Sequence, residues 1–197
     1  SLLRNTLVQR SPIYYGWVIL LLGITSSLTA VAVLFWTITI YIPAIAEDFN
    51  VGGDAQRTPV IIAFMVGSLL SALAGPLAGR WMDARGARET ILVGSVVAAG
   101  ALLLTSQATE LWQICAGWAV VSLARTLLFP VPYSWLVTRW FSTRRQMVLG
   151  VLTIGFGLGG ILVLPLSRVE ERWDWSIVMI VSAVIVLLSN GLLALIF

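Results

Sequence analysis

The chain has 197 residues, of which 59% are hydrophobic and only 11% are charged, and its formal net charge is +3. Soluble domains are usually about 45–50% apolar and about a quarter charged, so this composition excludes an ordinary soluble fold. With one cysteine and no histidine, the chain excludes a disulfide framework, a haem protein, and a zinc or Ser–His intramembrane protease. We therefore expect no enzyme, metal or cofactor, and we attribute the net charge to membrane orientation rather than to nucleic-acid binding.

Long uncharged stretches divide the chain into six predicted membrane spans. A helix that crosses the hydrocarbon core of a bilayer needs roughly 20 predominantly apolar residues. These stretches are too long for barrel strands, which have about 10 residues of alternating character. In chain order the predicted spans are 17–42, 60–80, 90–107, 111–137, 147–167 and 175–197. The predicted fold class is therefore an all-α membrane protein, with residues 1–197 forming one six-helix transmembrane bundle.

The arginines predict which side of the membrane each end faces. Suppose that the N-terminus and the connections after the second and fourth spans share one side. That side then holds eight arginines and the other holds three: Arg4, Arg10, Arg80, Arg85, Arg88, Arg139, Arg144 and Arg145 against Arg57, Arg168 and Arg172. Basic loops stay in the cytoplasm, so we expect a multi-pass protein of a plasma membrane or bacterial inner membrane, with its N-terminus cytoplasmic.

The six predicted spans divide into two units of three, 1–107 and 111–197. An odd number of spans inverts the second unit relative to the first, and inverted repeats are typical of secondary transporters. The two units show no clear residue-level match, so the 3+3 prediction rests on the spans alone.

Residues 79–89, GRWMDARGARE, form a charged stretch between the second and third spans. The pattern Gly79-x3-Asp83-x2-Gly86-x-Arg88 resembles motif A of the major facilitator superfamily, commonly written G-x-L-A-D-R-x-G-R-K-x-x-L. The departures are Trp81, Ala84 and Ala87. The resemblance implies a transporter with alternating access, in which this loop clasps the cytoplasmic side of the other half in one state. The alternative is a plain basic turn with no further role.

Elementary chemistry suggests what each motif residue does in such a loop. Gly86 allows a turn with positive φ. Asp83, at a membrane boundary, can accept hydrogen bonds from a helix N-terminus and meet its dipole. Arg88 can tether the loop or meet lipid headgroups.

Two further stretches are similar to one branch of the superfamily. Tyr14-Tyr-Gly-Trp17 and Trp140-Phe-Ser-Thr-Arg-Arg145 resemble the monocarboxylate-porter and oxalate:formate-antiporter branch, although Gln146 replaces its usual glycine. The branch implies carboxylate substrates such as oxalate, formate, lactate or pyruvate. Major facilitators have twelve helices around a central site, so we expect this chain to be the N-terminal half, with a C-terminal six-helix half as its partner.

Arg125 is the leading candidate for substrate contact. It lies about midway along the span 111–137, and none of the six spans contains an acidic residue that could pair with it. An ionisable side chain at the bilayer centre is costly and by default marks a pathway or a ligand site. A guanidinium can bind a carboxylate through two parallel hydrogen bonds. The alternatives are that Arg125 binds backbone carbonyls inside the bundle or pairs with an acidic group in the missing half.

Helical spacing adds further candidates. Phe129 and Tyr133 follow Arg125 at i+4 and i+8, so both lie on or near its face of a continuous helix. In the first span Thr29 and Trp36 lie on one stripe and offer a hydroxyl and an aromatic wall to a small anion. The alternative for Thr29 is that its hydroxyl bonds only to its own helix backbone.

These features predict a secondary or facilitative transporter for a small organic anion, a mono- or dicarboxylate. Because the spans contain no Asp, Glu, Lys or His, they offer no buried proton carrier, which favours antiport or facilitated transport. Two alternatives remain at this point. One is a major facilitator for another substrate, such as a drug or metabolite exporter, and the other is a six-helix membrane scaffold that transports nothing.

Overall fold

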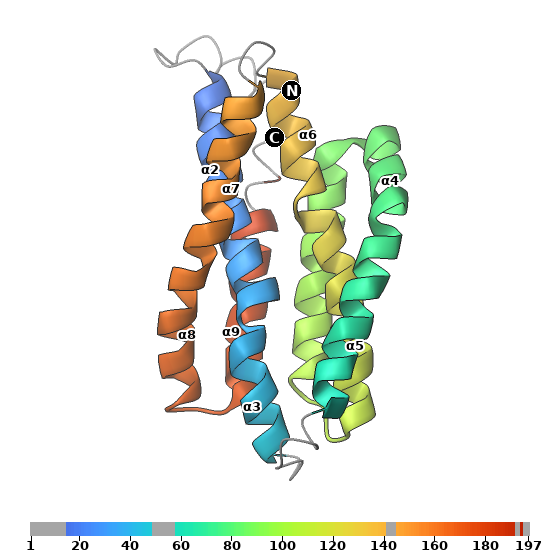
Figure 1. The fold of residues 1–197 in the computed structure, drawn as a ribbon, viewed down its shortest axis with the longest axis vertical. Helices are drawn as coiled ribbons and strands as arrows, with labels where there is room; N and C mark the ends of the chain where they lie inside the picture. Colours follow the sequence, from blue (N-terminus) through green and yellow to red (C-terminus); the bar gives the residue numbers. More distant parts are fainter. Residues whose placement is uncertain (1–14, 49–57, 141–144, 192–193, 195–197) are drawn as a thin grey trace.

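The computed structural model describes residues 15–48, 58–140, 145–191 and 194, and every regular element within them is helical. In chain order the elements are α2 (Tyr15–Val31), the π-helical turn η1 (Ala32–Trp36), α3 (Ile38–Asp48), α4 (Thr58–Thr105), α5 (Leu111–Leu128), α6 (Val131–Trp140), α7 (Arg145–Gly159), the 3-10 turn η2 (Gly160–Leu162), α8 (Val163–Glu170), α9 (Trp175–Val186) and the π-helical turn η3 (Leu187–Gly191). They run lengthwise beside one another as a bundle (Figure 1). The predicted all-α class is therefore confirmed for the described ranges.

Parts of several predictions fall outside the described residues. These parts are Tyr14 of the first aromatic motif, residues 141–144 of the second, residues 192–193 and 195–197 of the last predicted span, and Arg4, Arg10 and Arg57 of the charge comparison.

α4 contains both the second and the third predicted spans, 60–80 and 90–107, as a pair of antiparallel arms (Figure 1). The backbone is helical throughout except at Gly86, which has φ 85° and ψ 165°. This combination of a positive φ with an extended ψ is open almost only to glycine. The expectation of a loop over 79–89 is therefore corrected, because helix continues on both sides and the reversal is concentrated at one residue.

Four helical stretches are long and apolar enough to cross a membrane. They are Leu20–Asp48, Ile61–Thr105, Leu111–Trp135 and Arg145–Glu170, and Trp175–Gly191 is a shorter apolar helix. The number is below the predicted six because the two arms of α4 count as one stretch and the last helix is short. The division into six crossings and two inverted units of three therefore stays a prediction.

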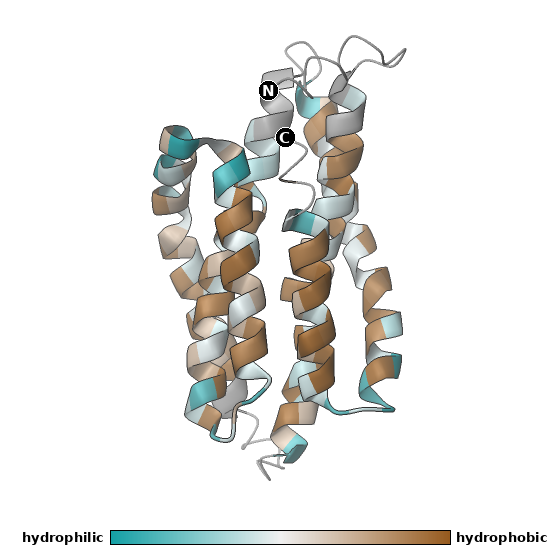
Figure 2. Cartoon of the chain, turned by 180° about the vertical axis from the view of Figure 1, so that it is seen from behind, coloured by the Kyte–Doolittle hydropathy of each residue, from teal (hydrophilic) through white to brown (hydrophobic). Residues whose placement is uncertain are grey.

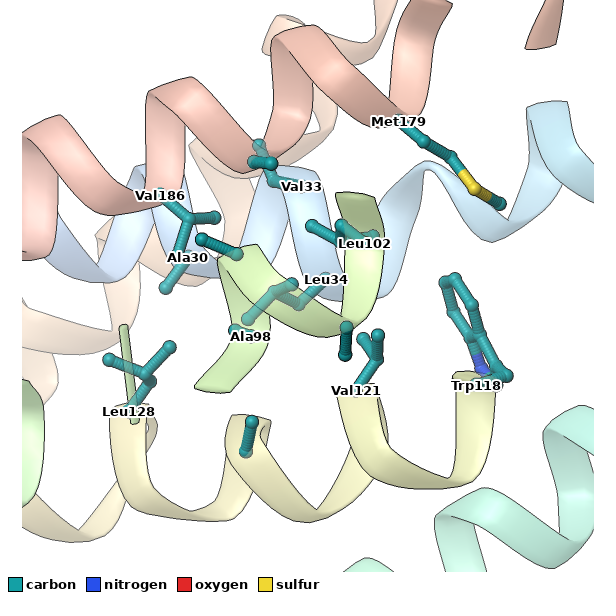
Figure 3. Packing of buried hydrophobic residues seen from close by; sticks show 14 of the residues in the cluster. Ala30, Val33, Leu34, Ala98, Leu102, Trp118, Val121, Leu128, Met179 and Val186 are labelled. Carbon is teal, nitrogen blue, oxygen red and sulfur yellow. The ribbon is translucent and has the colours of Figure 1, made fainter. Parts of the chain in front are cut away.

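The core lies where the second arm of α4 meets η1, α5 and α9 (Figure 3). Its central side chains are at most 3% exposed: Ala98 and Leu102 from α4, Val33 and Leu34 from η1, Trp118 and Val121 from α5, and Met179 and Val186 from α9. Small residues let the helices approach closely, and this packing is what holds helices together in lipid.

The outer faces of the bundle are also apolar (Figure 2). Leu69 and Leu73 on the first arm of α4, with Ile161 in η2 and Leu164 in α8, are each 59–67% exposed. An apolar surface on this scale is unusual for a soluble protein and normal for helices that contact lipid or another apolar domain. The fold therefore agrees with a multi-pass membrane protein.

Candidate functional site

The fourth predicted span is interrupted near its middle. α5 ends at Leu128, Phe129 has extended backbone angles (φ −154°, ψ 145°), and α6 begins at Val131. Proline disfavours a helical conformation in the residue before it, and Pro130 follows Phe129. Arg125 therefore lies in the last turn of α5, where the partial negative charge of a helix C-terminus stabilises a cation.

Arg125 borders a cavity of about 200 Å³, which we call the Arg125 cavity. The cavity is lined by Ala30, Val31, Phe35, Ser71, Arg125, Phe129, Pro130 and Phe156. The Cζ atom of Arg125 lies 5.4 Å from the centroid of the Phe35 ring, within the range of a cation–π interaction. Among the described residues, the guanidinium, which carries five donors, has no hydrogen bond or ion pair.

A pair of hydroxyl groups lies next to Arg125. Ser71, from the first arm of α4, lines the Arg125 cavity, and its Oγ lies 2.6 Å from Oγ1 of Thr126. Thr126 also donates to the backbone oxygens of Ser71 and Ser122, at 3.2 and 3.3 Å. This pairing holds the first arm of α4 against α5 and places a hydroxyl in an otherwise largely apolar cavity.

The π-helical turn η1 determines which aromatic side chains reach the cavity. A π-helical turn adds a residue to the helical repeat and changes the direction of the side chains after it. Phe35 lies in this turn and lines the cavity. Trp36 lies in the same turn but does not line the cavity. The Trp36 ring packs against Phe35 and Phe156 at centroid distances of 5.6 and 6.2 Å, and its Nε1 donates to the Phe156 carbonyl at 3.3 Å.

Thr29 satisfies its hydroxyl within its own helix. Its Oγ1 donates to the backbone oxygens of Thr25 and Ser26, at 3.1 and 3.0 Å. This is the geometry of the alternative that sequence reasoning left open for this residue. A substrate contact for Thr29 stays a prediction without support from its hydrogen bonding.

Tyr133 lies away from the Arg125 cavity. Its side chain is fully buried, and its hydroxyl contacts Ser26 of α2 and donates to Asn190 Oδ1 of η3 at 3.1 Å. Ser26 also donates to Asn190, so the three side chains link α2, α6 and η3. The expected shared face with Arg125 is corrected, because the helical phase does not continue across the break at Phe129. The substrate role of Tyr133 stays a prediction.

The motif residues lie around the reversal of α4. Gly86 has the expected positive φ, and Asp83 and Arg88 are exposed on either side of it. Within the described ranges, Asp83 has no hydrogen bond to a helix N-terminus. At this turn Thr90 Oγ1 donates to the Gly86 carbonyl at 2.9 Å. Gly79 lies in the first arm, and a Cβ built on it would meet nothing within 4 Å.

Exposed charges at this turn interact with their own helix neighbours. A guanidinium nitrogen of Arg85, Nη1, lies 3.9 Å from Oε2 of Glu89 across the reversal. The Cζ atom of Arg85 is 4.6 Å from the centroid of the Trp81 ring. Surface pairs of this kind contribute about 0–1 kcal/mol, so the turn depends on Gly86 more than on its charges.

Comparisons with known proteins agree with this architecture. The family model described as Major Facilitator Superfamily matches residues 24–197. The chain belongs to the major facilitator superfamily. This membership supports interpreting residues 79–89 as motif A, with a glycine at the position where the backbone needs one.

Matches to three curated relatives show that this major facilitator chain corresponds to only part of each relative. Monocarboxylate transporter 11 of Homo sapiens is 28% identical over 136 residues, which is 68% of this chain and 28% of that protein. MFS-type transporter pynF of Aspergillus niger is 35% identical over 135 residues, 66% of this chain and 30% of the relative. Uncharacterized transporter ESBP6 of Saccharomyces cerevisiae is 32% identical over 131 residues, which is 63% of this chain and 19% of that protein. Each match covers less than a third of the relative's length.

Sequence reasoning about this major facilitator missed Phe35, Phe156 and Ser71 as cavity residues. Ser71 carried a usable signal, because Gly67, Ser71 and Gly75 repeat at i+4 and such small-residue stripes mark helix contacts. Phe35 and Phe156 carried none, because isolated aromatic residues in apolar spans look the same whether they face lipid, core or cavity.

Proposed function

We propose that this chain forms the N-terminal six-helix half of a transporter that carries a small organic anion by alternating access. The observation that carries the proposal is Arg125, a cation without a hydrogen bond or ion pair among the described residues, beside a cavity at the middle of a membrane-crossing segment. A carboxylate satisfies a guanidinium with two parallel hydrogen bonds. The similarity to a protein named monocarboxylate transporter 11 supports the same substrate class.

The direction of the helices supports the six-crossing part of the proposal. The start of α2, the reversal within α4, the end of α6 and the start of α7 lie at one end of the bundle (Figure 1). The end of α3, the start of α4 and the connections α4–α5 and α8–α9 lie at the other end. In our proposal the first end faces the cytoplasm, because it carries the larger number of arginines.

The distribution of acidic residues supports exchange or facilitated movement rather than proton coupling within this half. Among the described residues, carboxylates occur near helix ends, as at Asp48, Asp83 and Asp174. None of them borders the Arg125 cavity. A carrier that exchanges one anion for another needs no buried carboxylate relay.

The test is uptake of radiolabelled pyruvate and oxalate by proteoliposomes that contain the complete protein with Arg125→Gln. Removing one partner of a desolvated charge pair costs about 2 kcal/mol or more, so we expect uptake to fall at least about 30-fold. Arg168→Gln, which removes the same charge from an exposed site at the end of α8, is the matched control and should keep wild-type uptake.

Three outcomes separate the proposal from its alternatives. Unchanged uptake in Arg125→Gln, at equal amounts of folded protein, contradicts the role of Arg125. Uptake that lipophilic cations inhibit and carboxylates do not indicates a drug exporter instead. No substrate-dependent flux in the wild-type protein indicates the membrane scaffold.

A further inference from the structure

Three phenylalanine rings form an aromatic side of the Arg125 cavity. We call Phe35, Phe129 and Phe156 the phenylalanine wall; they come from η1, the residue after α5, and α7. Phe156 is central, because its ring centroid lies 5.6 Å from that of Phe35 and 5.8 Å from that of Phe129, the latter pair stacked at 29°. Segments far apart in the chain therefore converge on one aromatic surface.

Close approach of α7 to the first helix brings Phe156 into the wall. A Cβ at Gly159 would lie 3.2 Å from the backbone nitrogen of Ala32 and 3.3 Å from the carbonyl oxygen of Leu28. These distances are too short for most side chains, so the absence of one at Gly159 allows the backbones to approach. Phe156, about one turn earlier on α7, then lies beside Phe35.

The wall differs from the aromatic pairs that fill the core. Phe64 is 4% exposed and packs on Trp118 at 4.2 Å, whereas Phe35 is 40% exposed although it lies in the middle of a membrane-crossing segment. Phe35 also faces the Arg125 guanidinium at 5.4 Å. The wall therefore presents ring surface next to the cation instead of burying it.

The chemistry of the cavity is a single cation beside aromatic faces. A ligand carboxylate that meets Arg125 must place the rest of the molecule among the remaining lining groups, which are mostly apolar. Aromatic rings pair at centroid distances of about 4.5–7 Å in stacked or edge-to-face arrangements, and gain more than burial alone provides. A flat apolar tail can make these contacts, whereas a one-carbon or two-carbon tail leaves the wall uncovered.

We propose that the phenylalanine wall makes the Arg125 cavity select carboxylates that carry a flat aromatic group, with Phe156 as the residue that determines this specificity. The inference rests on the proposed function, because it takes Arg125 as the contact for the carboxylate. The inference adds to that function the kind of group, a flat aromatic one, that the substrate carries beside its carboxylate.

The experiment compares phenylpyruvate with pyruvate, which share the 2-oxo acid and differ in the ring. Uptake of each is measured at pH 7.5 in proteoliposomes with the complete protein, and the flux into protein-free liposomes is subtracted. For the wild type we expect a KM for phenylpyruvate at least about 10-fold below that for pyruvate. Phe156→Leu keeps an apolar side chain and removes the ring, so it should reduce this ratio about 5-fold.

Phe64→Leu is the matched control, because it removes a ring from the core and not from the wall. It should leave the KM ratio at the wild-type value even if the amount of folded protein falls. Phe129→Leu, a second variant in the wall, should lower the ratio in the same direction as Phe156→Leu. The wild-type ratio is itself a test that does not depend on whether a variant folds.

The outcomes separate this inference from the proposed function. Equal KM values for the two anions in the wild type, or an unchanged ratio in both wall variants, overturn the inference and leave anion transport standing. If neither anion enters above the protein-free level and Arg125→Gln changes nothing, the proposed function fails and the inference falls with it.

Discussion

At the scale of single residues, polar side chains in these apolar helices differ in where they find partners. Thr25 and Thr29 donate to their own helix backbone, which any helix allows and which identifies no site. Ser26 contacts Tyr133 and Asn190 across the bundle, a pairing that ties helices together. Arg125 does neither within the described residues, and that contrast is why it carries the proposed function.

Gly86 allows a test at the same scale. Its φ of 85° and ψ of 165° lie in a region that costs other residues about 1–3 kcal/mol. We expect Gly86→Ala to lower the free energy of unfolding by about that amount, measured by denaturant titration in detergent.

The control for this prediction is Gly79→Ala, in the first arm of α4. A Cβ there meets nothing within 4 Å, and alanine in a helix is favoured over glycine by about 0.5–1 kcal/mol. This variant should be neutral or slightly stabilised. Equal losses in both variants would show that the reversal does not depend on the backbone freedom of Gly86.

At the scale of elements, the interruptions of the helices do more than the helix lengths to determine which side chains line the Arg125 cavity. The π-helical turn η1 orients Phe35, and the extended residue Phe129 ends α5 just after Arg125. Each interruption changes the direction of the side chains that follow it. Phe35, Phe129 and Pro130 of the cavity lining therefore lie where ideal helical periodicity fails.

The contact between α2 and α7 can be tested through two glycines of α7. A Cβ at Gly155 would lie 2.9 Å from the Ile24 carbonyl oxygen, whereas one at Gly157 would meet nothing within 4 Å. Forcing an extra carbon into a packed contact costs about 1–3 kcal/mol. We expect Gly155→Ala to lower the thermal unfolding midpoint in detergent and Gly157→Ala to leave it unchanged or higher. A lower midpoint in Gly157→Ala alone would contradict this packing.

At the scale of the whole molecule, the bundle has two different ends. One carries the α4 reversal with its exposed Asp83, Arg85 and Arg88, and the other carries Asp48, Glu170 and Asp174 near the α8–α9 connection. The superfamily model matches residues 24–197. The pairwise matches cover less than a third of each relative described above. In our proposal a second half meets the apolar faces of this bundle, and the arginine-rich end contacts it in one state.

Asp83→Asn tests the proposed clasp in the complete protein. Because Asp83 is exposed at the reversal and does not line the Arg125 cavity, its loss should slow the conformational exchange and leave substrate binding intact. We expect the maximal uptake rate to fall about tenfold, equivalent to about 1.4 kcal/mol, with the dissociation constant for pyruvate unchanged.

The control for Asp83→Asn is Glu89→Gln, which removes an exposed negative charge from the same turn at a position that the motif leaves unspecified. It should keep the wild-type rate. Weaker binding with a normal maximal rate in Asp83→Asn would place the residue at the substrate site instead and contradict the clasp.

The sequence by itself determined the class of this protein, because apolar length and the spacing of charges are local properties. It predicted a helix start at residue 111 and a positive φ at Gly86, both of which the structure shows. It also identified Arg125 as an arginine without an acidic partner in the spans.

Only the tertiary structure decided what surrounds Arg125. The π-helical turn and the break at Phe129 reset the direction of side chains, and helical spacing cannot be extended across such points. The close approach of Gly159 to Ala32 brings α7 beside the helix that contains Phe35. For this reason Phe35 and Phe156 line the cavity, while Tyr133 joins α2 and η3.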